Sequence, residues 1–237
     1  MSDAETVLPD RPTSRWLILD GQGRVLLFRF VYSDGPIAGA TFWATPGGAV
    51  DTGESYEDAA RRELFEETGT LLAVDDDGEL LADARPFHDH RLKLESHELS
   101  LTDVLRESNL NVHADLLRPA ARWVGRSERG NWFDTFTFVA ANPEGQEPDA
   151  HTGEADDANW FPPQLLLDGW RYGLVRLAPS TWAQLMELLT FDTVEEVLAA
   201  ADGASLAPVI GDPVDDPRYR EFFTFVPVDR IGKRHGI

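Results

Sequence analysis

Three glutamates, Glu63, Glu66 and Glu67, are spaced so that they share one face of a predicted helix. Residues three and four positions apart on a helix are neighbours, and like charges there destabilise it by roughly 0.2–0.5 kcal/mol per pair. A bound divalent cation would reverse the sign of that cost. Hard ions such as Mg2+ or Mn2+ prefer carboxylate oxygens as ligands and can also hold phosphate groups. A Mg2+ or Mn2+ ion that also holds phosphate groups would therefore suit this spacing.

The glutamates belong to a longer pattern that runs from residue 48 to residue 69. Its order is Gly, five residues, Glu, seven residues, Arg-Glu-Leu, one residue, Glu-Glu, one residue, Gly. This segment resembles the Nudix box, the signature of the Nudix hydrolases, at eight of its nine fixed positions. Thr70 departs from the pattern, because an aliphatic residue is usual there, although Leu71 follows it. Three spaced glutamates alone would indicate only an exposed charged face, but their register with Glu54 and Arg62 favours the motif.

The resemblance implies an α/β (α+β) fold, namely an α/β/α sandwich around a mixed sheet. It also implies hydrolysis of a nucleoside diphosphate linked to another moiety. The implied Mg2+ or Mn2+ ligands are three side chains and one backbone carbonyl, those of Glu63, Glu66, Glu67 and Gly48. Arg62 would orient the glutamates through charge-assisted hydrogen bonds, and Glu54 would tie the preceding loop to the helix. Gly47 and Gly48 would let the backbone approach the ions closely.

Hydrolysis of a diphosphate also needs a base that deprotonates the attacking water. Glu66 or Glu67 could serve, but many members of the family use a glutamate on a late loop. Here that position matches Glu154, which precedes a Trp-Phe-Pro run. The same loop carries three rivals for the role, His151, Asp156 and Asp157.

Other polar residues have simpler interpretations. Arg122, Arg126 and Arg129 flank a predicted hairpin and could hold substrate phosphates, although surface ion pairs are the more common use of arginine in so acidic a chain. His88 and His90 could suggest a metal site. We interpret this stretch as a polar loop.

Composition restricts the function classes. The chain has 237 residues and no cysteine, which excludes disulfides and thiolate metal sites. Its net charge of -21 argues against a general nucleic-acid binder and leaves a small phosphorylated metabolite as the expected partner. No apolar run approaches the roughly 18 residues of a membrane span, and the first residues do not resemble a signal peptide. We therefore expect a cytoplasmic protein without membrane contact.

Apolar alternation and turn signals predict the order of elements. Strands are expected at residues 15–20, 24–32, 42–45, 71–74, 121–126, 132–140 and 159–161, with 221–228 also extended. Helices are expected at 55–68, 100–106, 162–167, 180–189 and 193–201; Ser55 and Gly69 supply the cap signals of the first. We predict an arm over 1–12, a Nudix domain over 13–175, and a helical C-terminal extension over 176–237. Helices between 180 and 201 could cover a sheet edge or form a homodimer contact.

The sequence leaves the substrate open. The order of segments after the box is similar to that of the coenzyme A diphosphatase-like branch of the family, but the separate coenzyme A signature before the box is absent. ADP-ribose or another nucleotide sugar, coenzyme A-type compounds and nucleoside triphosphates therefore all stay as candidates. A catalytically silent Nudix module that senses a nucleotide is the alternative, and the complete glutamate set argues against it. Processing of RNA ends or caps fits poorly with the negative charge.

Overall fold

The computed structural model describes residues 11–31, 39–126, 132–149, 155, 157–210 and 220–224. Its strands are β1 (Arg11–Leu19), β2 (Val25–Val31), β3 (Thr41–Ala44), β4 (Gly47–Ala49), β5 (Arg118–Arg126), β6 (Trp132–Ala141), β7 (Asp157–Phe161) and β8 (Val209–Ile210). Its helices are α1 (Tyr56–Thr68), α2 (His88–Glu95), α3 (Leu101–Glu107), α4 (Pro163–Arg171), α5 (Pro179–Leu188), α6 (Val194–Ala201) and α7 (Arg220–Thr224). None of these helices is long and apolar enough to cross a membrane.

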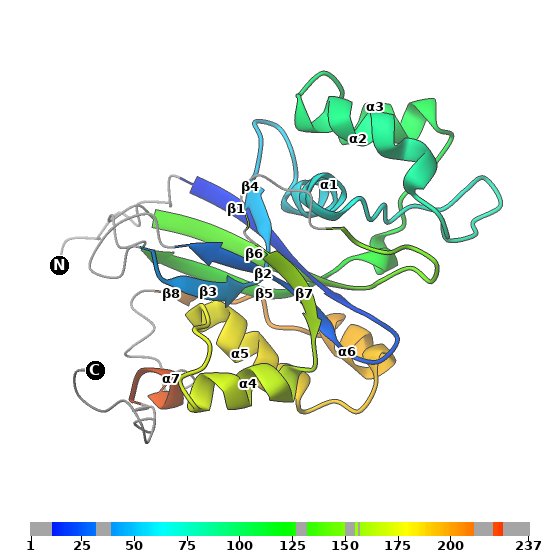
Figure 1. Ribbon diagram of the computed structural model, residues 1–237. Helices are drawn as coiled ribbons and strands as arrows, with labels where there is room; N and C mark the ends of the chain where they lie inside the picture. Colours follow the sequence, from blue (N-terminus) through cyan, green and yellow to red (C-terminus); the bar gives the residue numbers. More distant parts are fainter. Residues whose placement is uncertain are drawn as a thin grey trace.

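The strands form one mixed sheet in the order β3-β2-β1-β6-β5-β8. Strand β1 runs parallel to β6 and antiparallel to β2 and β4, while β7 pairs with β2. Helix α1 covers one face of the sheet, and α4, α5 and α6 cover the other (Figure 1). This arrangement confirms the predicted α/β/α sandwich.

Alternation along β1 explains how the sheet carries helices on both faces. Trp16 and Ile18 pack in a cluster with Leu64 of α1, whereas Leu17 and Leu19 pack in a second cluster with residues of α4 and α5. All four β1 residues are at most 3% exposed. Because successive side chains of a strand point to opposite faces, this apolar run is expected of a strand that is buried on both sides.

The predicted hairpin, the β5–β6 pair and most of the predicted helices are confirmed, but the strand predicted at 71–74 is wrong. This segment is buried without a ladder to any described strand, and Val74 makes isolated bridges to Leu80 and Asn111. At Leu71 the side chain of Gln146 takes the place of a neighbouring strand: its Oε1 accepts from Leu71 N at 2.9 Å, and its Nε2 donates to Leu71 O at 3.0 Å. A buried apolar segment can therefore satisfy its backbone hydrogen bonds without joining a β-sheet.

Two further predictions are corrected. His88 and His90 lie on helix α2, not in a polar loop, because the helical turn Arg85–Phe87, which contains Pro86, leads into α2, and Arg91 and Leu94 bury one face of that helix. Residues 221–224, predicted to be extended, belong to helix α7. Phe222 of α7 stacks on Trp170 of α4 with ring centroids 5.5 Å apart, so tertiary packing decides the local conformation.

The boundaries of the predicted domains stay a prediction. Strand β1 already begins at Arg11, and the region after residue 175 is connected to the sheet: Trp43 N donates to Arg176 O at 2.8 Å, and Thr45 N donates to Thr181 Oγ1 at 3.1 Å. Helix α5 thus packs as an integral layer of the sandwich.

Candidate active site

Helix α1 carries the glutamates, and local signals fix both of its ends. Ser55 caps the start by accepting a hydrogen bond from Asp58 N at 3.0 Å, as predicted. Gly69 ends the helix in the left-handed conformation, with φ 73°, where a glycine costs least. Ala60 and Leu64 pack on the sheet. This packing fixes the rotation of α1 and hence the direction in which its polar face points.

Arg62 stands at the centre of that polar face and is only 7% exposed. Its Nε and Nη2 atoms donate to the two carboxylate oxygens of Glu54 at 2.9 and 3.0 Å, and Nη2 also donates to Ala49 O at 2.8 Å. Its Nη1 donates to Glu63 Oε1 and to Glu66 Oε2, both at 2.9 Å. Burial works against the charge of Arg62, but these acidic partners together raise its pKa above the ordinary value. The guanidinium therefore stays charged and holds three carboxylates in place.

Glu66 has one satisfied and one unsatisfied carboxylate oxygen. Oε2 accepts from Arg62, whereas Oε1 is buried and has no hydrogen-bond partner among the described residues. Burial raises the pKa of the Glu66 carboxyl to about 7; the Arg62 charge opposes this shift, and the Glu63 charge adds to it. A buried carboxylate oxygen without a donor is costly, and a cation or a proton would remove that cost.

Glu67 lies one position further along the helix and is oriented by the sheet. Trp16 Nε1, from β1, donates to Glu67 Oε2 at 2.9 Å, and Glu67 is 6% exposed. The indole N–H is a donor only, so it satisfies one oxygen of the carboxylate. Trp16 is a residue that sequence reasoning did not assign to the site.

The backbone at Gly47 and Gly48 passes close to this cluster. A Cβ placed on Gly48 would lie 2.2 Å from Glu63 Oε1, and one on Gly47 would lie 2.2 Å from Ser14 O. Gly47 also has φ +125°, a conformation that other residues rarely adopt. A side chain at either position would therefore collide with a neighbouring residue. At Gly48 that neighbour is Glu63, one of the predicted metal ligands.

These residues fit a divalent cation by their chemistry. The donor set consists of carboxylates and backbone, as hard ions require, and it includes the unsatisfied oxygen of Glu66. Within the described ranges, no three acidic or histidine side chains converge as a ready-made metal site. Arg62 Nη1 lies between Glu63 and Glu66, while Glu67 is hydrogen-bonded to Trp16. A cation held by these glutamates would therefore compete with Arg62 for their oxygens.

The other predicted residues are only partly placed. Glu154, His151, Asp156 and Arg129 lie outside the described residues, as does the side chain of Arg126. Asp157 is the first residue of β7, and its Oδ2 lies 3.7 Å from Arg29 Nη1. Arg122 donates to both carboxylate oxygens of Asp134, at 2.9 and 2.6 Å, and its guanidinium carbon lies 5.0 Å from the centroid of the Phe136 ring. Arg122 is thus held in an ion pair.

Sequence reasoning also missed Arg91, which lies on α2 and is 3% exposed. Its Nε donates to Glu66 O at 2.9 Å, and its Nη1 donates to Asp149 Oδ2 at 2.8 Å. Arg91 therefore connects the segment after the box to the end of the glutamate helix. Its distance of 25 positions from Glu66 left no local signal for this contact.

Thr70, the departure from the box pattern, is 1% exposed. Its backbone N donates to Thr68 Oγ1 at 3.1 Å, but its own hydroxyl has no partner within the described part of the chain. Leu71, at 2% exposure, packs with Phe65 in the cluster that joins α1 to α2 and α3. The aliphatic contact is thus supplied one residue later.

Comparison with known proteins supports the resemblance to the Nudix hydrolases. The model of the NUDIX domain matches residues 9–123. An RNA pyrophosphohydrolase of Mesorhizobium japonicum is 33% identical over 171 residues, which cover 70% of this chain and 83% of that protein. An RNA pyrophosphohydrolase of Novosphingobium aromaticivorans is 41% identical over 88 residues, which cover 37% of this chain and 50% of that protein.

A solved structure extends this likeness to the fold. The crystal structure of a NUDIX hydrolase from Alicyclobacillus acidocaldarius matches with a TM-score of 0.67 and 25% identity, over 81% of this chain and 97% of that one. Three observations indicate the same family: the α/β/α sandwich, the glutamate helix with its arginine, and the sequence identity to these relatives. The chain therefore belongs to the Nudix hydrolase family and is a pyrophosphohydrolase.

Proposed function

We propose that this protein is a metal-dependent hydrolase that cleaves the diphosphate of a small nucleoside diphosphate derivative. The observation that carries the proposal is the buried cluster around Arg62, in which Glu66 keeps one oxygen without a protein donor among the described residues. Nudix hydrolases generally use divalent metals such as Mg2+ or Mn2+. Here Glu63, Glu66, Glu67 and the carbonyl of Gly48 would hold the ion.

When bound, Mg2+ or Mn2+ supplies Lewis-acid neutralisation of the negative charge of the diphosphate. The residues of the chain supply orientation. Arg62 fixes Glu63 and Glu66 through a shared guanidinium nitrogen, and Trp16 fixes Glu67 from the sheet. Glu66 Oε1 is the oxygen that no described donor engages, so it can hold a cation or accept a proton. Glu154 is the alternative base that the family pattern indicates.

The charge of the chain supports a small substrate. A net charge of -21 repels long polyanions, whose binding depends on neutralising many phosphates. A nucleotide sugar such as ADP-ribose, a coenzyme A-type compound or a nucleoside triphosphate presents only a few charges, which the cation offsets. The 5′ end of RNA is the second candidate, because the relatives from Mesorhizobium japonicum and Novosphingobium aromaticivorans are named RNA pyrophosphohydrolases.

A product assay tests the proposal and separates the two candidates. The purified chain is incubated with Mg2+ or Mn2+ and with ADP-ribose, coenzyme A, sugar nucleotides, nucleoside triphosphates or a 5′-triphosphorylated oligoribonucleotide, and products are identified by mass spectrometry. We expect turnover of a small substrate. Preferred cleavage of the oligoribonucleotide at physiological salt would instead favour the RNA end.

Two variants connect turnover to the cluster. Glu66→Gln and Glu67→Gln should lose most turnover and stay folded, whereas Glu79→Gln, on an exposed turn, should keep the wild-type rate. Wild-type turnover in both cluster variants would refute the proposed site. Saturable binding of a nucleotide without any product would favour the silent sensor.

A further inference from the structure

Within the described ranges, two residues other than glycine have a positive φ, and each follows a helix of the segment after the box. His97, with φ 57°, follows α2, and Asn109, with φ 53°, follows α3. Glycine, and less often asparagine, is the usual residue in the left-handed conformation at a helix end. Asn109 fits this rule. A histidine there costs free energy that a glycine would not cost, and such strain is typical of functional positions.

The fold makes no use of the His97 side chain. The helix end is built by the backbone: His97 N donates to Leu94 O at 2.9 Å, and Glu98 N donates to Lys93 O at 2.8 Å. A glycine at position 97 would make the same bonds. The side chain of His97 is exposed, and its ring makes no hydrogen bond or ion pair with a described residue. The strained histidine therefore has no structural reason among the described contacts.

The packing of α2 on α1 brings His97 to the glutamate helix. Leu94, which accepts the hydrogen bond from His97 N, packs in one apolar cluster with Phe65 of α1. Arg91, one turn earlier on α2, donates to Glu66 O at 2.9 Å. Figure 1 shows both helices on the same side of the sheet. The end of α2 therefore lies next to the part of α1 that carries the proposed metal ligands.

The imidazole of His97 also acts on the glutamate cluster electrostatically. Burial raises the pKa of the Glu66 carboxyl, and the charges that shift it are those of Arg62, Glu63 and, with a smaller effect, His97. Of these three, His97 alone lies outside the Nudix box. A positive charge lowers the pKa of a carboxyl only when it is near. The ring therefore lies within electrostatic range of the carboxylate that has the unsatisfied oxygen.

A diphosphate that is held by a cation still needs hydrogen-bond donors for its outer oxygens. The two arginines of this region already have acceptors. Arg62 donates to three carboxylates, and Arg91 donates to Glu66 O and Asp149. The imidazole of His97 carries an N–H donor in either neutral tautomer, and no described residue accepts from it.

We propose that His97 donates a hydrogen bond to a phosphate of the bound substrate, and that the end of α2 is therefore one wall of the active site. The strained backbone directs a side chain toward the cluster at a position where glycine would be more stable. The inference rests on the proposed function, because it presupposes a phosphorylated substrate at the glutamates.

Equilibrium binding tests the contact separately from turnover. The full chain is titrated calorimetrically, in the presence of Mg2+, with imidodiphosphate, whose P–N–P bridge resists hydrolysis. His97→Gly should weaken binding roughly tenfold or more, the fold-change expected for one lost hydrogen bond to a charged group. The thermal midpoint of this variant should rise by roughly 2–4 °C, because the backbone strain is relieved. Weaker binding by a more stable protein cannot be a folding defect.

Asn109→Gly is the matched control. Asn109 is exposed, has a similar φ and also follows a helix of the same segment, so its replacement should leave the affinity for imidodiphosphate unchanged. His97→Asn, which tolerates the left-handed conformation but is shorter, should bind as weakly as His97→Gly. Unchanged affinity in His97→Gly, an equal loss in Asn109→Gly, or no binding by the wild type would overturn the inference. A lower thermal midpoint in His97→Gly would also overturn it, because the histidine would then serve the fold.

The two proposals fail in different ways. A loss of imidodiphosphate affinity in His97→Gly alone, in a chain that hydrolyses no nucleoside diphosphate derivative, would leave the contact standing and refute the proposed function. Turnover by the wild type, together with unchanged imidodiphosphate affinity in His97→Gly, would do the reverse.

Discussion

Replacing Arg62 by methionine should reveal how much one buried guanidinium contributes to the free energy of unfolding. Methionine has a similarly long but apolar side chain, so the substitution removes the charge and the hydrogen-bond donors but keeps much of the volume. Five hydrogen bonds, to Glu54 (twice), Glu63, Glu66 and Ala49, disappear. Breaking one partner of a buried ion pair costs about 3–5 kcal/mol because the remaining charge is left uncompensated. Here three carboxylates are left, so we expect the free energy of unfolding to fall by at least about 3 kcal/mol.

Urea denaturation of the full chain, followed by tryptophan fluorescence in a chelating buffer at neutral pH, measures this loss. Arg85→Met is the matched control: Arg85 is 90% exposed and pairs with Asp83 at 2.8 Å, so its removal should not change the stability measurably. Adding Mn2+ should restore part of the stability of Arg62→Met, because a cation held by Glu63 and Glu66 replaces the lost charge. An Arg62→Met variant within about 1 kcal/mol of the wild type in chelator would refute the reasoning that three partly buried carboxylates depend on this arginine for compensation of their charge.

Three other substitutions test the cluster and its surroundings. Trp16→Phe removes the donor to Glu67, so the free energy of unfolding should fall by about 1.5–3 kcal/mol in urea denaturation, the range for a hydrogen bond to a charged group; an unchanged midpoint would contradict this. Gly48→Ala places a methyl group against Glu63 Oε1, so Mn2+ affinity in calorimetric titration should fall by roughly tenfold or more, whereas Gly21→Ala, which meets no atom within 4 Å, should leave it unchanged. Thr70→Val replaces a buried hydroxyl without a described partner and should raise the free energy of unfolding by about 1 kcal/mol, seen as a higher thermal midpoint; a lower midpoint would show that the hydroxyl is satisfied.

The sequence predicted the parts of this protein that depend on residues close together in the chain. Ser55 and Gly69 give the ends of α1 within a few residues of the structure, and Asp20 with its neighbours gives the hairpin turn, where Asp20 Oδ1 accepts from Gln22 N and Arg24 N. The contact of Arg62 with Glu66, four positions further along the helix, likewise follows from helical spacing. Local spacing was therefore sufficient for the centre of the site.

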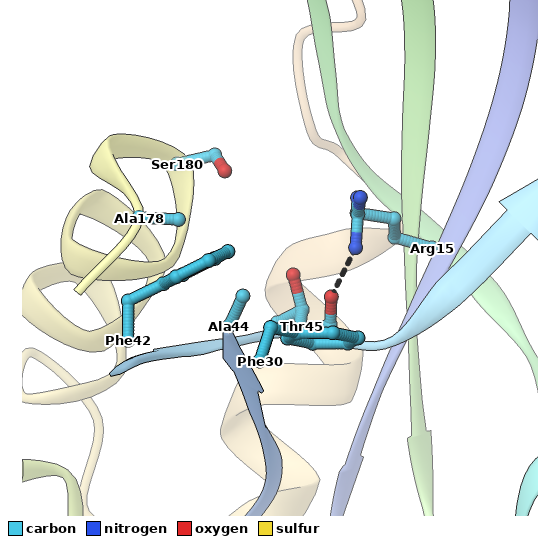
Figure 2. A pocket seen from close by; sticks show the side chains of 7 residues that line it. All are labelled: Arg15, Phe30, Phe42, Ala44, Thr45, Ala178 and Ser180. Carbon is cyan, nitrogen blue, oxygen red and sulfur yellow. Dashed lines mark hydrogen bonds between the residues drawn. The ribbon is translucent and has the colours of Figure 1, made fainter. Parts of the chain in front are cut away.

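Residues far apart in the chain decide what the sequence did not predict. The segment 71–74 is apolar enough for a strand, but Gln146, 75 positions from Leu71, satisfies the backbone of Leu71, and Asn111 satisfies that of Val74. Arg15 of β1 and Ser180 of α5 line the same small cavity (Figure 2), and no spacing within one element could indicate that these residues meet. Pairwise contacts of this kind become visible only when the topology is known.

Arg91 shows why the segment after the box matters for the site itself. The last turn of α1 contains no basic residue, although a helix ends with carbonyls that lack partners and with a partial negative charge. Arg91 of α2 supplies the missing cation by donating to the carbonyl of Glu66, and Asp149 holds it there. The cluster that joins Phe65 of α1 to Leu94 of α2 fixes the same contact through apolar packing. Helix α2 therefore stabilises the end of α1 that carries the glutamates. It does so at Glu66, whose side chain has the unsatisfied oxygen.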